Sequence, residues 1–152
     1  MNNKLREEEV EKILNMYRSV QRNFKSRFEK VAKQYGFTSP QLAVIFQLHE
    51  TPSITLNELS NHMRLTKSTV SGIVDRLTKQ GVVIREIPKD NRRIVNLSIS
   101  EEFKKNNDIC AIKKRFSQEL ICGSINSSNS VDIEKIICGL EELNLLLKNS
   151  DD

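Results

Sequence analysis

The stretch that decides the fold is Leu56–Ser100, LNELSNHMRLTKSTVSGIVDRLTKQGVVIREIPKDNRRIVNLSIS. Just before it, Thr55 can cap a helix while Glu58 returns a hydrogen bond to the cap. This capping box predicts a short helix over residues 56–63. A tight link follows, and a second cap at Thr66 predicts a longer helix. Two helices joined by so short a link predict a helix-turn-helix.

The second half of the stretch predicts a β-hairpin. Residues 82–87 and 94–99 are rich in β-branched residues, and the segment 88–93 between them carries the turn residues Pro, Asp and Asn. An isolated hairpin is only marginally stable, so this one must pack against the helices before it. A helix-turn-helix followed by a hairpin predicts a winged helix-turn-helix over residues 36–100.

Helices are predicted on both sides of this winged segment. Apolar residues recur at three- and four-residue steps over residues 5–35, and Ser39-Pro40 predicts the N-cap and first turn of another helix. After the hairpin, Ser98 or Ser100 opens a single helix whose apolar stripe runs through Leu120. A last helix, rich in Ile and Leu, is predicted over 131–148. The fold class is therefore mainly α, of α+β type.

The flanking helices are expected to join two copies of the chain. Hydrophobic residues make up 38% of the sequence and aromatic residues 5%, which is lean for an isolated globule. We therefore expect residues 1–35 and 101–152 to form a helical dimerisation region. No apolar run approaches the roughly eighteen residues of a membrane span, and the N-terminus shows no secretory signal. A cytoplasmic protein without a membrane partner is expected.

Positive charge is concentrated in the centre of the chain. From Arg64 to Arg93 eight Lys or Arg stand against three acidic residues, a net charge of +5, whereas residues 94–152 carry −3. A local basic excess is typical of a surface that binds a polyanion such as DNA. The alternative is an ordinary solvated basic face.

The start of the second helix in the winged segment has the composition of a surface that reads bases. A helix-turn-helix places the N-terminal residues of its second helix against base edges in the major groove. Ser and Thr hydroxyls can meet donors or acceptors there, and Lys can reach guanine or phosphate. The alternative is an ordinary amphipathic helix, because Ser and Thr also cap well. The candidate DNA-binding residues on this helix are Thr66, Lys67, Ser68, Thr69, Ser71 and Arg76.

The tip of the hairpin, IPKDNRRI at residues 87–94, carries more positive charge than a turn requires. The narrow minor groove of DNA is strongly negative and attracts an inserted arginine, and a hairpin tip is slim enough to enter it. A carboxylate at the tip can hold a neighbouring arginine in one rotamer. The alternative is a solvated turn whose charges protect the hairpin from aggregation. The candidate DNA-binding residues here are Lys89, Asp90, Arg92 and Arg93.

The same stretch resembles the MarR-type winged-helix transcriptional regulators of bacteria and archaea. The resemblance rests on VDRLTKQGVV at residues 74–83, and on a D-x-R turn followed by IVNLSIS. It implies a homodimer that binds a pseudo-palindromic operator in double-stranded DNA, as a repressor in our prediction. It also implies that Arg92 reads the minor groove and that Asp90 orients it. Arg93 is then either a phosphate contact or itself the reader.

The resemblance further implies that a small aromatic or anionic effector releases the protein from DNA. The effector pocket cannot be placed from the sequence, and a core role is the alternative for each of four candidates: Tyr17, Phe24, Phe46 and His49. A cysteine-based redox-responsive regulator is a second form of control. Oxidant-sensing relatives carry a cysteine near the start of the first long helix, but Cys110, Cys122 and Cys138 lie elsewhere, in apolar helical patterns where free Cys acts as a small hydrophobe.

Other functional classes find little support in the sequence. There is no GxGxxG, P-loop, HExxH or GxSxG motif, and no CxxC pair, so we expect neither an enzyme nor a cofactor or metal. A winged-helix module that binds proteins and not DNA remains an alternative. Such a module would not need the central basic window or Arg92.

Overall fold

The computed structural model describes residues 2–122 and 132–148. The chain divides into two compact units, residues 1–120 and 121–152. Among the described residues no helix is long and apolar enough to cross a membrane. The elements follow in the order α1 (Asn2–Gln34), α2 (Ser39–Glu50), β1 (Ile54–Thr55), α3 (Leu56–Met63), α4 (Lys67–Lys79), β2 (Val83–Glu86), β3 (Asn96–Ile99), α5 (Glu101–Asn106), α6 (Ile109–Cys122) and α7 (Ile133–Lys148).

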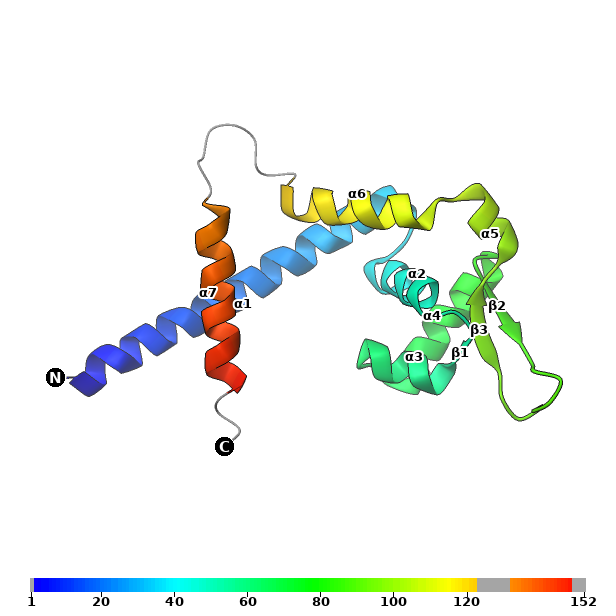
Figure 1. The fold of residues 1–152 in the computed structure, drawn as a ribbon, viewed down its shortest axis with the longest axis horizontal. Coiled ribbons are helices and arrows are strands. Elements are labelled where there is room, and N and C mark those ends of the chain that lie inside the picture. The colour runs from blue at the N-terminus through cyan, green and yellow to red at the C-terminus, as the bar shows by residue number, and fades with distance from the viewer. Residues whose placement is uncertain (1, 123–131, 149–152) are drawn as a thin grey trace. The chain divides into compact units, whose positions relative to one another are not determined.

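A winged helix-turn-helix lies at the centre of the first unit, as predicted. Helices α2, α3 and α4 pack beside a small antiparallel sheet (Figure 1). Each helix contributes aliphatic residues to one core, which the inward side chains of the hairpin complete. The side chains most completely buried in this core include Val44, Ile45, Leu48, Leu59, Val70, Val74, Leu77, Val83, Leu97 and Ile99. Burial of this apolar surface is the main force that holds the hairpin against the helices.

The sheet has three strands in the order β1-β3-β2. Strands β2 and β3 form the hairpin, with Val83 opposite Ile99 and Glu86 opposite Asn96, and β1 pairs antiparallel with the outer edge of β3. The sequence did not predict β1, because two residues are too few to show an alternating pattern. The paired strands are also shorter than predicted, so the connecting wing loop spans residues 87–95.

Caps fix where the helices of the lobe begin. The predicted capping box is confirmed: the Thr55 amide donates to Glu58 Oε2 over 2.7 Å, and the Glu58 amide donates to Thr55 Oγ1 over 3.2 Å. The prediction that Ser39 caps α2 is wrong. Thr38 is the cap, because Gln41 stands three residues later and completes a second capping box with it. Of the two serines considered for α5, Ser100 is the cap.

A second, smaller core joins α1 and α2 to α6. It is built from Val31, Ala32, Leu42 and Phe116, with the Phe28 ring packed edge-on against Phe116 at a centroid distance of 4.6 Å. The Arg27 guanidinium donates two hydrogen bonds, of 3.0 and 2.9 Å, to the carbonyl of Glu119 near the end of α6. The C-terminal half of α1 is thereby fixed to the winged lobe.

The prediction of one helix after the hairpin is wrong, because the chain breaks between α5 and α6. Asn107 leaves the helical conformation with φ −139° and ψ 122°. Asp108 then accepts a hydrogen bond of 3.0 Å from the Ala111 amide and starts α6. Five polar residues, 104–108, interrupt the apolar spacing at this point, and Asp108 is a typical N-cap residue, so the sequence does carry a signal for the break.

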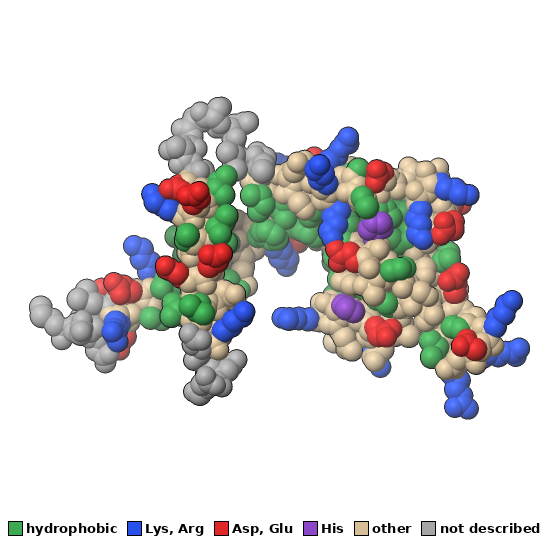
Figure 2. Space-filling view, in the orientation of Figure 1, with side chains coloured by type: hydrophobic (Ala, Val, Ile, Leu, Met, Phe, Trp, Pro, Cys, Tyr) green, Lys and Arg blue, Asp and Glu red, His purple; other side chains and the backbone are tan. Residues whose placement is uncertain are grey.

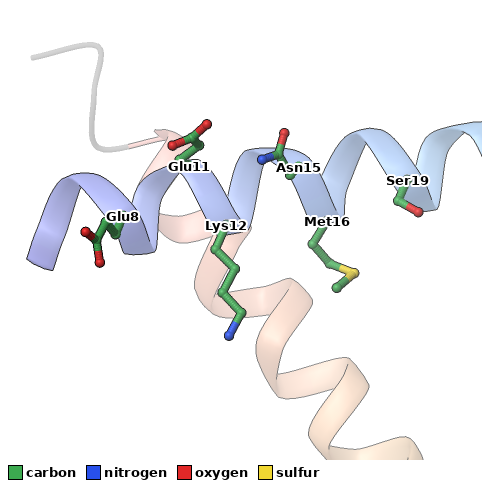
Figure 3. Close-up of a pocket in the computed structure, with 6 residues that line it drawn as sticks. All are labelled: Glu8, Glu11, Lys12, Asn15, Met16 and Ser19. Atoms are coloured by element: carbon green, nitrogen blue, oxygen red, sulfur yellow. The ribbon is translucent and has the colours of Figure 1, made fainter.

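Helix α1 exposes apolar side chains as far along the chain as Phe24 in the single chain. Tyr17 and Phe24 are each 48% exposed, so neither has the core role considered for it, whereas Phe46 is half-buried and packs against Phe116. Figure 3 shows other side chains of this part of α1 at three- and four-residue steps: Glu8, Glu11, Lys12, Asn15, Met16 and Ser19.

Helix α7, in the second unit, is apolar and exposed along most of its length. Its exposed aliphatic residues include Ile133, Ile136, Ile137 and Leu140 (Figure 2). Two of the cysteines that were predicted to act as small hydrophobes, Cys110 and Cys138, are exposed free thiols in this single chain. The side chain of Cys122 lies outside the described residues.

Candidate nucleic-acid interface

Helix α4 presents one polar face and buries the other. Val70, Ile73, Val74 and Leu77 point into the core of the lobe. The predicted site residues Lys67, Ser68, Thr69 and Arg76 are exposed, and Ser71 is half-buried. The sequence pattern of a helix with a buried apolar face and a polar leading end is therefore present in the structure.

Hydroxyl groups cluster at the start of α4. Thr66 is the N-cap, and its Oγ1 accepts a hydrogen bond of 3.3 Å from the Thr69 amide. The same oxygen lies 2.8 Å from Thr69 Oγ1 and 3.1 Å from Ser68 Oγ. Three predicted site residues thus share one hydrogen-bonded cluster. The Thr66 hydroxyl uses its donor and both acceptor sites within the cluster, whereas the hydroxyls of Ser68 and Thr69 retain further sites.

The link between α3 and α4 fixes the angle between these two helices. Arg64 adopts a left-handed conformation with φ 52°, which is uncommon for a residue other than glycine. Its amide donates to the Asn61 carbonyl, and the next amide, of Leu65, donates to the Ser60 carbonyl, each over 3.1 Å. These bonds close the end of α3, so the helix-turn-helix is a tight, internally bonded unit.

The wing loop carries four predicted site residues, all exposed. Figure 2 shows basic side chains gathered over this loop, at the lower right. Asn91 organises the loop: its amide donates to the Pro88 carbonyl, its side-chain oxygen accepts from the Arg93 amide over 3.1 Å, and its carbonyl accepts from Ile94. Asn91 was predicted as a turn residue, and its side chain has that role, because it bonds the backbone two residues on.

The pairing considered for the wing carboxylate does not form in the free protein. In the part of the chain that the structure describes, no hydrogen bond or ion pair joins Asp90 to Arg92 or Arg93. Both arginine side chains therefore extend without a fixed partner.

An ion pair ties the wing to α4. Asp75 Oδ1 on α4 lies 2.5 Å from a terminal guanidinium nitrogen of Arg85 on β2, and both side chains are about half exposed. No sequence pattern pointed to this pair, because ten residues and a change of secondary structure separate its members. It joins the two elements that carry the predicted site residues.

The capping box of α3 changes the pKa of one of its own residues, Glu58. Hydrogen bonds from the Thr55 amide, and then from its hydroxyl, lower the pKa of the Glu58 carboxyl below its ordinary value. Both donors stabilise the ionised form. A charged Glu58 is therefore part of the device that starts the helix-turn-helix.

A groove of about 530 Å³ lies beside the C-terminal end of α2 and the junction of α5 with α6. Lys104 and Lys105 line it with the half-buried His49, whose Nε2 is 3.1 Å from Cys110 Sγ. Of the four residues considered for an effector pocket, only His49 lines this groove. Among the described residues, no group of three or more side chains is arranged to hold a metal ion.

Residues 37–95 match the model of the MarR family. The HTH-type transcriptional regulator YkoM of Bacillus subtilis is 34% identical over 92 residues, a match that spans 58% of this chain and 60% of YkoM. A MarR family protein from Bacillus stearothermophilus has a similar structure, with 25% identity, a TM-score of 0.69, and coverage of 96% of this chain and 98% of that one. Reduced AbfR, solved bound to DNA, shares the fold at 24% identity and a TM-score of 0.65, with both chains fully covered.

Proposed function

We propose that this chain, whose residues 37–95 match the model of the MarR family, is a transcriptional regulator of that family and a sequence-specific DNA-binding repressor. One observation carries the proposal. In the described part of the chain, Lys67, Arg76, Lys89, Arg92 and Arg93 are exposed, and none of their side chains has an ion-pair or hydrogen-bond partner. These five exposed cations on one lobe offer a surface for phosphates. Because none of them is paired within the described protein, no existing contact has to break when they bind a phosphate.

The two parts of this surface read DNA differently in our proposal. The start of α4 enters the major groove, where Ser68 and Thr69 meet base edges and Lys67 meets guanine or phosphate. The wing enters the adjacent minor groove, with Arg92 as its reader. That AbfR, which shares this fold, was solved bound to DNA supports DNA as the partner of this chain.

The functional unit that we propose is a homodimer, with residues 36–100 as the DNA-binding domain. The apolar stripes that α1 and α7 expose in the single chain would be covered by a second copy. Stable obligate interfaces commonly bury over about 2,000 Å². A two-fold dimer predicts a pseudo-palindromic operator with half-sites about 10 base pairs apart, or a multiple of that spacing.

We further propose that a small anionic effector binds in the groove lined by His49, Lys104 and Lys105. The lining of the groove is mixed: Lys104 pairs with Glu101 over 2.9 Å, Lys105 is the second cation, and the remaining lining includes Leu48, Pro52, Ile109 and the Asp108 carboxylate. A carboxylate on an aromatic ring would place its charge at the lysines and its ring against the apolar residues, and a volume of about 530 Å³ accommodates it. The groove adjoins α2, whose far side packs against α4, so occupation can bias the position of the recognition helix. Benzoate is a simple probe: it should raise the dissociation constant for the operator, and Lys104→Ala/Lys105→Ala should abolish that response.

A competition titration tests the proposal. The purified protein is titrated, at several salt concentrations, with pooled duplex fragments from the region around its own gene and random DNA as competitor. Retention of one fragment over the competitor supports a regulator and identifies its operator. Equal binding of all DNA, or none at low salt, would instead favour a winged-helix module that binds another protein.

A further inference from the structure

The glycines of this chain differ in whether their backbone conformation requires a glycine. Gly36 and Gly81 have positive φ values of 78° and 73°, a conformation that other residues rarely adopt. Gly72, in the middle of α4, has no such φ. A Cβ built on it would meet no heavy atom of the chain within 4 Å outside its own helix backbone. Neither backbone conformation nor packing within the described protein therefore requires a glycine there.

A glycine at this place weakens the helix. Glycine in a helix interior is less stable than alanine, because its backbone loses more conformational freedom on folding. Alanine would fit at Gly72 without a clash inside the protein. Gly72 thus lowers the stability of α4, and nothing in the fold of the described protein explains why a glycine is there.

The position of Gly72 shows where the reason lies. Residues three and four apart lie on the same face of a helix. Gly72 is therefore between Ser68 and Thr69, one turn before it, and Asp75 and Arg76, one turn after it. All four of these residues are exposed. Gly72 is at the middle of the polar face of α4, opposite the side chains that enter the core.

We propose that Gly72 is a specificity-determining position, at which a base-pair edge in the major groove packs directly against the backbone of α4. The absence of a side chain lets the duplex approach the helix more closely here than anywhere else on this face. The hydroxyls of Ser68 and Thr69 then come within hydrogen-bonding reach of their bases. This inference rests on the proposed function and adds to it a contact that carries no charge.

The test compares Gly72→Ala with Gly139→Ala. Gly139, in the middle of α7, also has ordinary helical geometry and no neighbour within 4 Å in the single chain, so it reports the same chemical change away from α4. Because α7 belongs to the proposed dimer interface, sedimentation equilibrium first establishes that Gly139→Ala has the same mass in solution as wild type. Both substitutions should raise the melting temperature, by about 2–4 °C for a chain of this size. Only Gly72→Ala should weaken binding to the preferred duplex, by about tenfold or more. The slope of affinity against salt should not change, because no charge is lost.

Two results would overturn the inference. A Gly72→Ala variant that is stabilised and binds the preferred duplex as tightly as wild type would show that DNA does not approach this position closely. A lower melting temperature for Gly72→Ala would show instead that the glycine serves the fold. Failure of the proposed function itself is distinguished in the same experiment, because wild type would then prefer no duplex over random DNA.

Discussion

Asp75 on α4 and Arg85 on β2 form an ion pair of 2.5 Å that joins the recognition helix to the wing. Both side chains are about half exposed, so the pair should contribute less than about 1 kcal/mol to folding. Its effect on binding should be larger. Arg85→Ala leaves the Asp75 carboxylate uncompensated beside DNA phosphates and should weaken binding.

A double-mutant cycle measures that coupling. If the two charges are coupled, Asp75→Ala should improve operator binding more in the Arg85→Ala background, where the carboxylate is uncompensated, than in the wild type. Strictly additive effects on binding would show that the two residues act independently.

Arg92→Ala should weaken operator binding by about 1–3 kcal/mol while the dimer remains intact. Arg92→Lys should keep the salt dependence but not the full affinity, because the planar guanidinium suits a narrow minor groove better than an ammonium group does. Fluorescence anisotropy with a labelled operator measures both. Arg115→Ala, at an exposed position on α6, is the matched control. An unchanged affinity for Arg92→Ala would remove the minor-groove role.

Lys67→Ala should reduce both affinity and its salt dependence if this side chain meets a phosphate. Loss of one phosphate contact lowers the slope of log K against log salt by about 0.9. The slope is obtained from titrations at four or five salt concentrations. Lys114→Ala, on the exposed face of α6, removes the same charge away from the interface and should leave the slope unchanged. A slope that Lys67→Ala does not alter would point to a base contact.

The capping boxes show what local sequence can predict. Thr55 and Glu58 specified the start of α3 because all the atoms of the motif lie within four residues. The same locality explains why Thr66 and Ser100 could be named as caps. Ser39 was misjudged because Thr38, Ser39 and Pro40 are all start signals, and the choice among them depended on Gln41.

Features that depend on residues far apart in the chain could not be predicted from the sequence. Strand β1 exists only because β3 offers it an edge, and Asp75 meets Arg85 only after the hairpin folds back on α4. The candidate site residues of α4 and the wing were named from charge and residue type. The exposure of Tyr17 and Phe24 could not be foreseen, because an apolar stripe looks the same whether it faces a core or a second subunit.

The capping carboxylate of Glu58 predicts a pH dependence of stability. Its pKa is lowered in the folded state by the hydrogen bonds from Thr55. A lowered folded pKa gives stability that is present above the unfolded pKa and lost as the pH falls through the folded pKa. Wild type should therefore be more stable than Glu58→Gln near neutral pH, and the difference should shrink below about pH 4.

Denaturant titrations between pH 7 and pH 3 measure that difference. Glu29→Gln, on an exposed carboxylate of α1 without a hydrogen-bond partner among the described residues, is the control and should show no such trend. A difference for Glu58→Gln that stays constant down to pH 3 would show that the charge of the carboxylate does not contribute.

The apolar stripe of α7 predicts the oligomeric state. Leu140→Glu places a charge in the middle of the exposed aliphatic residues and should convert the dimer to a monomer with weaker operator binding. Glu142→Gln, on the opposite side of the helix, should leave the dimer unchanged. Sedimentation equilibrium gives the mass of each variant. A monomeric wild type that binds its operator fully would contradict the dimer.

Methylation protection by dimethyl sulfate on the operator tests the central claim most directly. The reagent reads guanine N7 in the major groove and adenine N3 in the minor groove within one experiment. With wild type, guanines in each half-site and adenines in the flanking minor groove should both be protected. With Arg92→Ala, at a protein concentration that saturates the DNA, the adenine protection should disappear and the guanine protection should remain. Protection that Arg92→Ala leaves complete, or a wild type that protects neither groove, would contradict the account of α4 and the wing as one DNA-reading surface.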